Sequence, residues 1–260
     1  MSEPLVSAVI VTRNRVALAR RALLCLRNQT WPNLDLVIVD DGDESYEGLV
    51  AEFKDDFPIK YHRMKPDPKL KLGGLRNLAA ELAPGEYLVQ WDDDEWFHPD
   101  RISYQMETLR KHNLDAVVLR WTLMHLDSPE LVNHPYRSGL PRGVPGTILH
   151  RRTSARYPNW RRHEDAVFRR RVKRKGRLGI ATGDHAHLFI RCFHGTNTWE
   201  EKHFTERLHY SWPDKLRYFK ARYIDGDILK LPPFNLNADE MASAERMIRE
   251  SRELGVLRHG

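Results

Sequence analysis

The sequence predicts an α/β fold with a mostly parallel central sheet flanked by helices, and two observations support this prediction. Short apolar runs rich in β-branched residues recur through the first 120 residues, and each is apolar throughout rather than alternating. Such runs are typical of strands that are buried on both faces, as in a parallel sheet. Segments with a helical spacing of apolar residues separate the runs, and this alternation is the pattern of α/β domains.

Four apolar runs are the predicted strands of this sheet, and they lie at residues 6–11 (VSAVIV), 36–39 (LVIV), 87–89 (YLV) and 116–119 (AVVL). The predicted helix after the first strand has Asn14 as its N-cap and ends near Pro32. A second predicted helix ends at Pro84, and a third has Pro99 in its first turn.

The rest of the chain is less regular, and the sequence predicts two strands and two helices there. The strands lie at residues 143–150 and 186–193. A basic helix covers residues 164–175 and is closed by Gly176. Asn237 caps a last helix, in which Glu240 completes a capping box. We therefore expect a small helical extension at the C-terminal end.

Length and cysteine usage narrow the class of protein. The 260 residues suffice for one large domain or two small ones. No run of about 18 apolar residues is present, so we expect no transmembrane helix. The N-terminal segment lacks a basic leader and a cleavage site, which argues against a secretory signal. Cys25 and Cys192 have no CxxC partner, which argues against a disulfide scaffold or a thiolate zinc site. We expect a reduced, cytoplasmic protein.

Positive charge is concentrated in one segment. The net charge is +6, and residues 151–177 contain 12 Lys and Arg against 2 acids, which leaves −4 for the remainder. This segment is either a solvated helix face or a surface that meets an anion. An anionic partner would be a phosphorylated substrate, an anionic membrane surface or a nucleic acid, and the nucleic acid is the least favoured of these.

Polar clusters follow three of the predicted strands. The first strand runs into residues 12–15 (TRNR), the second into residues 40–43 (DDGD) and the third into residues 92–94 (DDD). Ligands of open α/β sheets bind outside the carboxyl ends of the strands, so we expect these clusters to meet at one edge. A divalent cation would neutralise such crowded carboxylates, and oxygen ligands favour Mg²⁺ or Mn²⁺. The sequence therefore predicts a metal site suited to phosphate groups.

Several other classes lack their motifs here. No GxGxxG and no GxxxxGK[ST] follows the first strand, and no GxSxG is present. A nucleotidyltransferase of sugar phosphates also uses paired carboxylates and a metal, but its expected loop after the first strand is rich in glycine, unlike residues 12–15. A non-catalytic module that binds an anionic polymer is a further alternative, and it would bind with a steep salt dependence.

Four motifs, in their order and spacing, resemble family 2 glycosyltransferases of the GT-A fold. They are VSAVIVTRNR, VIVDDGDES, GGLRN and APGEYLVQWDDDEWFHPDR. The resemblance covers residues 4–120 strongly and 140–200 more weakly. It implies a GT-A-type, Rossmann-like fold with a nucleotide-sugar-binding half (1–120) and an acceptor-binding half of the same domain (121–200). The last 60 residues gain nothing from the resemblance, and we expect residues 201–260 to be a C-terminal accessory segment that forms a cap or a dimer contact.

The resemblance places the nucleotide of a donor sugar at the first two strand ends. Thr12, Arg13 and Arg15 match the loop that holds the nucleotide. Asp41 matches the acid that reads the base, typically uracil, and Asp40 is its alternative. A UDP-linked sugar is therefore the preferred donor.

The resemblance places the diphosphate and the metal around the third strand end. Arg76 and Asn77 match a pair that faces the phosphates and the sugar. Asp92, Asp93 and Asp94 match the DxD motif, in which Asp94 aligns with the metal-binding acid and Asp93 with the acid near the ribose. Asp92 completes the motif as a further metal or donor ligand.

An inverting enzyme of this family also needs a carboxylate that takes the proton of the acceptor hydroxyl. Residues 162–166 (RHEDA) resemble the family's ED motif, which implies Asp165 as the base and Glu164 as the alternative. Acids in a first helical turn also simply favour the helix dipole. His194 resembles a C-terminal HG element that adds an imidazole to the metal, although a capping histidine is the alternative.

Together these features predict a metal-dependent, inverting glycosyltransferase that acts in glycan or lipid-linked polysaccharide biosynthesis. The cofactor would be Mn²⁺ or Mg²⁺, and the acceptor would be anionic or presented at the inner face of a membrane, beside the basic segment 151–177. A modified nucleic-acid base is the alternative acceptor. The C-terminal segment leaves a homo-oligomer open.

Overall fold

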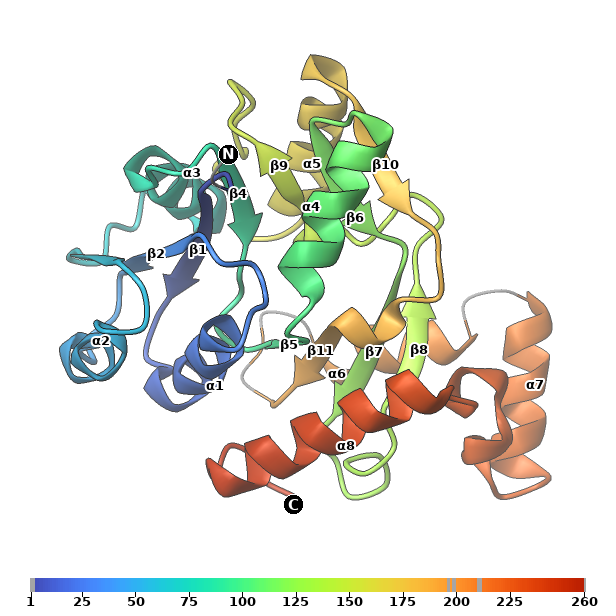
Figure 1. Cartoon of the computed structure of the whole chain (residues 1–260). Helices are drawn as coiled ribbons and strands as arrows, with labels where there is room; N and C mark the ends of the chain where they lie inside the picture. The colour runs from blue at the N-terminus through green and yellow to red at the C-terminus, as the bar shows by residue number, and fades with distance from the viewer. Residues whose placement is uncertain (1–2, 196, 198–199, 210–211, 260) are drawn as a thin grey trace.

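Two sheets organise the chain, as Figure 1 shows for the computed structural model, which describes residues 3–195, 197, 200–209 and 212–259. The larger sheet has seven strands in the order β10-β6-β9-β4-β1-β2-β3, and the smaller one has four in the order β5-β11-β7-β8. The strands are β1 (Val6–Thr12), β2 (Leu34–Asp40), β3 (Ile59–Arg63), β4 (Tyr87–Gln90), β5 (Trp96–Phe97), β6 (Ala116–Leu119), β7 (Trp121–Leu126), β8 (Tyr136–Gly139), β9 (Leu149–Arg151), β10 (Leu178–Ala181) and β11 (Phe189–Phe193).

Helices cover both faces of the larger sheet (Figure 1). The α-helices are α1 (Val16–Arg27), α2 (Glu47–Phe53), α3 (Leu72–Leu82), α4 (Arg101–His112), α5 (Glu164–Lys175), α6 (Glu201–Thr205), α7 (Trp212–Tyr223) and α8 (Ala238–Glu253). Short 3₁₀ helices lie at Pro145–Thr147, Ala186–Leu188, Glu206–His209, Ile228–Lys230 and Pro232–Phe234. No helix in the described ranges is long and apolar enough to cross a membrane.

The two faces of β1 explain why its sequence is apolar throughout. Ala8 and Ile10 join a core cluster to which α1, α4 and α8 contribute, whereas Val9 joins a second cluster under α3. β1 pairs in parallel with both β2 and β4. A fully buried Val or Ile side chain stabilises the fold by roughly 1.5–3 kcal/mol, so a polar residue on either face would be costly. The predicted mostly parallel sheet is thus confirmed.

The smaller sheet pairs the strand that follows the third polar cluster, β5, with the much later strand β11. β5 follows residues 92–95 directly and pairs antiparallel with β11, with Ile190 opposite Trp96. The Trp96 indole is fully buried and donates to the carboxylate of Glu250 in α8. This pairing brings the residues after β11 beside the acidic turn that precedes β5.

The structure confirms most predicted elements and corrects three details. All four predicted strands of the larger sheet form, as do α5 and the capping box of Asn237 and Glu240. Asn14 is not an N-cap: it has a φ of 52°, and its side chain accepts hydrogen bonds from the backbone of residues 43 and 44. Residues 143–150 form a 3₁₀ helix followed by the antiparallel strand β9, and 186–193 likewise begin as a 3₁₀ helix before β11.

Candidate active site

A cavity of about 730 Å³ lies at the carboxyl ends of β1, β2 and β4. This volume is within the range of small-molecule sites. Residues near the starts of α3 and α5, together with α6, also line it. Ten of the residues predicted for the site line this cavity: Thr12, Arg13, Arg15, Asp41, Arg76, Asp92, Asp93, Asp94, Glu164 and Asp165.

We name residues 92–95 the turn acids, and two of their carboxylates are held by groups at the end of β1 and in the loop after it. The Thr12 hydroxyl donates to the buried carboxylate of Asp93 at 2.5 Å. The Arg15 guanidinium lies 2.9 Å from Asp94 and 3.4 Å from Asp93. Burial and the charge of Asp94 raise the pKa of Asp93 to about 7, although Arg15 and Thr12 act in the other direction. This turn therefore carries more negative charge than its protein partners easily balance.

Asp94 is the turn acid that the protein stabilises in its ionised form. The His194 imidazole lies 3.3 Å from its carboxylate, and the side-chain amide of Asn197 is 3.4 Å away. Burial alone would raise the pKa of Asp94, but the hydrogen bond from His194 and the charge of Arg15 outweigh it and hold the pKa at about 2. At neutral pH Asp94 thus presents a full negative charge at the cavity.

The structure separates Asp40 from Asp41 by burial. Asp40 is fully buried, and its carboxylate accepts hydrogen bonds from the Tyr61 hydroxyl and the Gly42 amide. Asp41 lines the cavity, with the Arg13 guanidinium 3.9 Å from its carboxylate. Because the lone pairs of Asp40 are used inside the protein, Asp41 is the acid of this pair that a ligand can reach.

Arg76 connects the turn acids to the start of α5. Its guanidinium lies 2.8 Å from Asp92 and 3.3 Å from Glu164. Burial would lower the pKa of Arg76, but the charges of Asp92 and Glu164 outweigh it and raise the pKa. The segment before α5 approaches α3 closely at Gly73. Any residue with a Cβ at this position would place that atom 1.8 Å from the Pro158 carbonyl oxygen. The segment before α5 can therefore pack directly on α3.

Two acids at the start of α5, which we name the helix acids, differ in exposure. Glu164 is buried, and burial raises its pKa to about 7 even though the charge of Arg76 lowers it. Asp165 is partly exposed, and one of its carboxylate oxygens accepts from the Ala166 amide at 2.6 Å. Asp165 is thus the helix acid with an oxygen available to a second ligand in the cavity.

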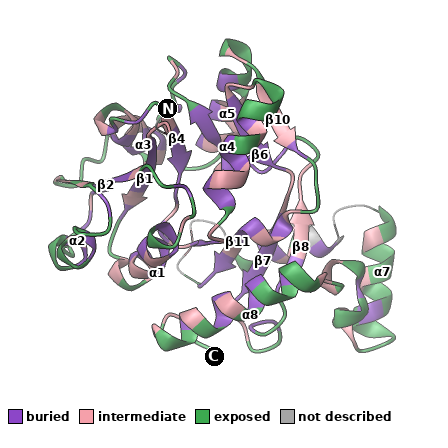
Figure 2. Cartoon of the chain, viewed as in Figure 1, coloured by how far each residue is buried: buried purple, intermediate pink, exposed green. Residues whose placement is uncertain are grey.

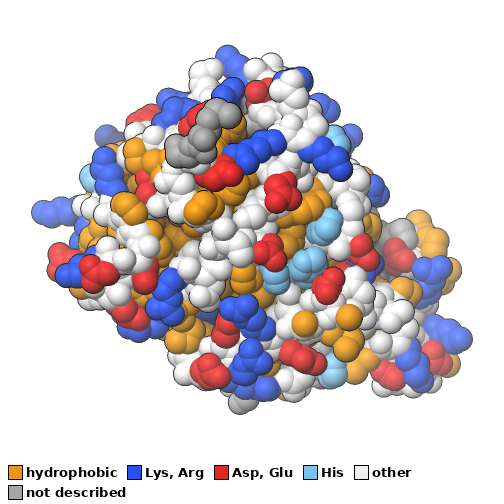
Figure 3. Space-filling model, in the orientation of Figure 1, with side chains coloured by type: hydrophobic (Ala, Val, Ile, Leu, Met, Phe, Trp, Pro, Cys, Tyr) orange, Lys and Arg blue, Asp and Glu red, His pale blue; other side chains and the backbone are white. Residues whose placement is uncertain are grey.

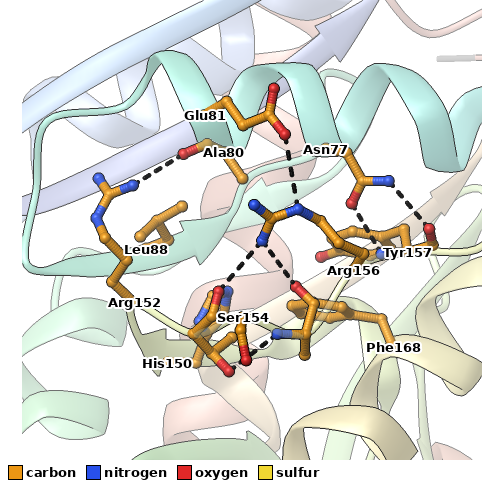
Figure 4. Close-up of a pocket in the computed structure, with 12 residues that line it drawn as sticks. Asn77, Ala80, Glu81, Leu88, His150, Arg152, Ser154, Arg156, Tyr157 and Phe168 are labelled. Carbon is orange, nitrogen blue, oxygen red and sulfur yellow. Dashed lines mark hydrogen bonds and ion pairs between the residues drawn. The ribbon is translucent and has the colours of Figure 1, made fainter.

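The predicted residue Asn77 does not line this cavity. Its side-chain amide both donates to the Tyr157 carbonyl and accepts from the Tyr157 amide, at 3.0 and 2.8 Å (Figure 4). These bonds form part of the wall of a smaller cavity of about 190 Å³ between α3 and residues 150–157. Arg152 and Arg156 line it too, but their guanidinium groups donate to backbone carbonyls there. In this structure the Asn77 amide holds the main chain of Tyr157 beside the site.

Three residues that the sequence analysis did not select support the site. The buried Tyr46 hydroxyl bonds to the Thr12 hydroxyl and accepts from the Arg15 amide. The buried guanidinium of Arg21 donates to the Asp94 carbonyl at 2.6 Å. A charged residue on the apolar face of α1 was the available signal for Arg21. Asn197, three residues after His194, had no such signal because its contacts depend on the pairing of β5 with β11.

The donors around Asp94 fit a divalent cation that also binds phosphate oxygens. Across the described ranges, no group of three His, Cys, Asp or Glu side chains is arranged to hold a metal ion. Mg²⁺ is commonly held by one or two carboxylates together with the phosphates of a substrate. The ionised carboxylate of Asp94 with the His194 imidazole beside it suits that mode, whereas Asp92 is engaged by Arg76 and Gln90.

The arrangement of the two sheets matches the GT-A-type fold of solved glycosyltransferases. The crystal structure of S. aureus TarS 1–349 has a TM-score of 0.60 to this chain at 17% identity and covers 96% of this chain and 91% of TarS 1–349. The mannosyltransferase PcManGT from Pyrobaculum calidifontis, in complex with GDP-Man and Mn²⁺, has a TM-score of 0.57 at 15% identity and covers 96% of this chain and 76% of that one. These likenesses show the fold.

The family is settled by sequence: the chain belongs to glycosyl transferase family 2, whose model matches residues 7–186. EpsH of Bacillus subtilis, named as a glycosyltransferase, is 32% identical over 116 residues, which are 42% of this chain and 31% of EpsH. The amylovoran biosynthesis glycosyltransferase AmsB of Erwinia amylovora is 30% identical over 108 residues, 40% of this chain and 36% of AmsB. The matched part thus spans about a third of these relatives.

Proposed function

We propose that this protein transfers a sugar from a nucleotide-diphosphate sugar, with UDP preferred, to an acceptor hydroxyl with inversion at the anomeric carbon. One observation carries the proposal: the turn acids and the helix acids line the same cavity and are joined through Arg76. The cavity thus has groups for a charged donor and for proton transfer. TarS 1–349 has been crystallised with UDP-GlcNAc, which supports a UDP-sugar as donor.

The donor would lie along the three strand ends. Asp41 would accept from the N–H of the uracil ring, because its carboxylate faces the cavity. Arg13 and Arg15 would face the diphosphate, whose negative charge they complement. Asp93 would accept from the ribose. Its pKa of about 7 suits a group that either accepts or donates a hydrogen bond to a hydroxyl.

Asp94 and His194 would hold the cation that the family implies. A bound Mn²⁺ or Mg²⁺ would supply positive charge for the diphosphate leaving group. Arg15 already lies 2.9 Å from the Asp94 carboxylate, so one positive charge stands beside this position before any donor arrives. The side chains of Arg21 and Asn197 would keep Asp94 in place, through its backbone carbonyl and its carboxylate.

Asp165 would act as the base. The acceptor oxygen forms a bond to the anomeric carbon while the bond from that carbon to the diphosphate oxygen breaks, and the diphosphate leaves with the electron pair. The acceptor proton moves to the Asp165 carboxylate. Glu164 would instead position Arg76, because its buried carboxylate is already paired with that guanidinium.

The acceptor would be an anionic or membrane-presented intermediate of polysaccharide biosynthesis. Arg161, Arg162 and His163 of the basic segment line the cavity immediately before the helix acids. The exposed face of α5 continues this positive surface through Arg170, Lys173 and Arg174. Relatives named for amylovoran and colanic acid biosynthesis support a role in polysaccharide assembly.

A donor screen tests the proposed function. Thermal shift and nucleotide release would be measured for UDP-, GDP- and dTDP-sugars with Mn²⁺ present. We expect a UDP-sugar to give the largest shift and to release UDP when a membrane extract supplies the acceptor. A protein that binds anionic polymer with a steep salt dependence but neither binds nor consumes any sugar nucleotide would contradict the proposal.

A further inference from the structure

The helix α7 carries an exposed apolar stripe. The side chains of Trp212, Leu216, Phe219 and Tyr223 are 77%, 67%, 57% and 71% exposed. Of the eight large hydrophobic side chains that are exposed among the described residues, these four and Ile224 lie within 13 consecutive positions. Single exposed apolar residues are normal on a soluble protein, but such a concentration marks an interaction surface.

The spacing of the stripe shows that it points away from the protein. Steps of four, three and four residues place its members on one side of the helix. Ala221 is buried and Tyr218 packs against the cluster that contains Tyr136 and Phe204, so these residues form the inward face. Most of α7 is exposed in Figure 2, where it stands at the edge of the molecule.

Basic residues flank the stripe. α7 contains four basic residues and one acid, Asp214. At 100° per residue, Lys215 lies on one side of the stripe and Lys220 on the other. The Lys215 ammonium lies 5.4 Å from the centre of the Trp212 ring. Figure 3 shows hydrophobic and basic side chains together in the region of α7, at the right edge of the view.

We propose that α7 docks on an anionic lipid surface, with its apolar stripe buried among the acyl chains and headgroups. Helices that lie in a membrane interface combine Trp, Phe and Leu on one face with Lys and Arg beside it, and α7 has this composition. Tyr and Trp favour this zone because their rings are apolar and their tips are polar. Charge argues against a second copy of the chain as the occupant, since two such stripes in contact would bring Lys215 and Lys220 of both copies together.

A membrane bound by α7 would lie close to one side of the cavity. His203 and Phe204 in α6 line the cavity, and the 3₁₀ helix at Glu206–His209 leads from α6 to α7. A membrane that binds α7 would therefore lie near the side of the cavity formed by α6. The docking surface does not depend on the proposed function, although a lipid-linked acceptor would be delivered to that side.

Vesicle sedimentation of the full chain tests this inference. We expect binding to phosphatidylglycerol vesicles and much weaker binding to phosphatidylcholine vesicles. Leu216→Glu with Phe219→Glu should abolish binding, and Lys215→Gln with Lys220→Gln should weaken it by about thirtyfold. Met241→Glu is the matched control, because Met241 is 50% exposed on α8 and its change should leave binding intact. Unchanged thermal unfolding would show that the exposed substitutions do not disturb the fold.

Three results would overturn the inference. The first is a wild-type protein that does not sediment with anionic vesicles. The second is binding that Leu216→Glu with Phe219→Glu leaves unchanged, which would move the lipid contact to another surface such as α5. The third is a dimer in light scattering that this double variant converts to a monomer without any vesicle binding, which would assign the stripe to a second copy. Loss of vesicle binding with donor consumption retained would leave the proposed function standing.

Discussion

Asp94 of the turn acids and Glu164 of the helix acids both have carboxylates at one cavity, but the protein treats them differently. It surrounds Asp94 with Arg15 and His194, which keep the pKa of that carboxyl at about 2. It pairs Glu164 with a single guanidinium and buries it, which raises the pKa of Glu164 to about 7. Asp165, next along the chain, is left partly exposed.

This difference supports the roles proposed for Asp94 and for Asp165. A carboxylate that stays ionised among cations suits the binding of further positive charge and of the phosphates that accompany it. Asp165 is open to the cavity, at the start of α5 and next to the buried Glu164. A carboxylate in such a position suits the transfer of a proton. Arg76 forms ion pairs with one member of each group, Asp92 and Glu164. The following predictions separate the two groups, from the largest expected effect to the smallest.

The largest effect is expected from Asp165→Asn. Loss of a general base typically costs 10²–10⁴-fold, so we expect transfer to fall by about 10³-fold while UDP binding is unchanged. Transfer would be measured as UDP released with a membrane extract as the acceptor source. Asp56→Asn, at an exposed acid outside the cavity, should retain wild-type rates. A fully active Asp165→Asn protein would move the base to another residue.

Arg76→Ala removes the link between the two groups. Breaking a buried ion pair leaves a carboxylate uncompensated, so we expect the free energy of unfolding to fall by about 3 kcal/mol. Arg20→Ala breaks the surface pair with Glu52 and should cost less than about 1 kcal/mol. Urea unfolding measures both. Equal losses for the two variants would show that the position of Arg76 between Asp92 and Glu164 adds nothing to stability.

Glu164→Gln tests the raised pKa of the helix acid. Because its pKa is about 7 in the fold and 4.5 in the unfolded chain, the native state binds more protons between these values. The contribution of Glu164 to stability therefore falls as pH rises from about 4.5 to about 7. The variant should lack this slope, a relative gain of about 3 kcal/mol across the window. Parallel pH profiles for wild type and variant would place the titration elsewhere.

The smallest effect is expected from the basic face of α5. Arg170→Glu with Lys173→Glu should raise the KM for an anionic acceptor by about threefold to tenfold, because exposed charges act mainly through long-range attraction. The dissociation constant of UDP should not change, since these residues do not line the donor side of the cavity. Unchanged acceptor kinetics would restrict the role of the basic segment to Arg161 and Arg162.

Much of this arrangement follows from the sequence because it depends on local rules. The parallel strands were predictable from runs that are apolar on both faces, and the meeting of residues 12–15, 40–43 and 92–94 follows from their places at strand ends. β3 (IKYHR) was missed because its polar composition suits an edge strand with half-exposed side chains.

Other features could not be predicted, because long-range packing decides them. Asp40 and Asp41 are equivalent in sequence, and only the burial of one behind Tyr61 distinguishes them. Asn77 matches a ligand pattern, but the approach of residues 157–160 to Gly73 turns its amide to the backbone of Tyr157. The meeting of His194 with Asp94 depends on the pairing of β5 with β11.

The most direct test of the division between the turn acids and the helix acids is a thermal shift with UDP, with and without Mn²⁺, for three proteins. Wild type and Asp165→Asn should both gain a larger increase in Tm from UDP with Mn²⁺ than from UDP alone. Asp94→Asn should lose that Mn²⁺-dependent part and keep the shift from UDP alone. An Asp94→Asn protein that responds to UDP and Mn²⁺ as wild type does would contradict the account.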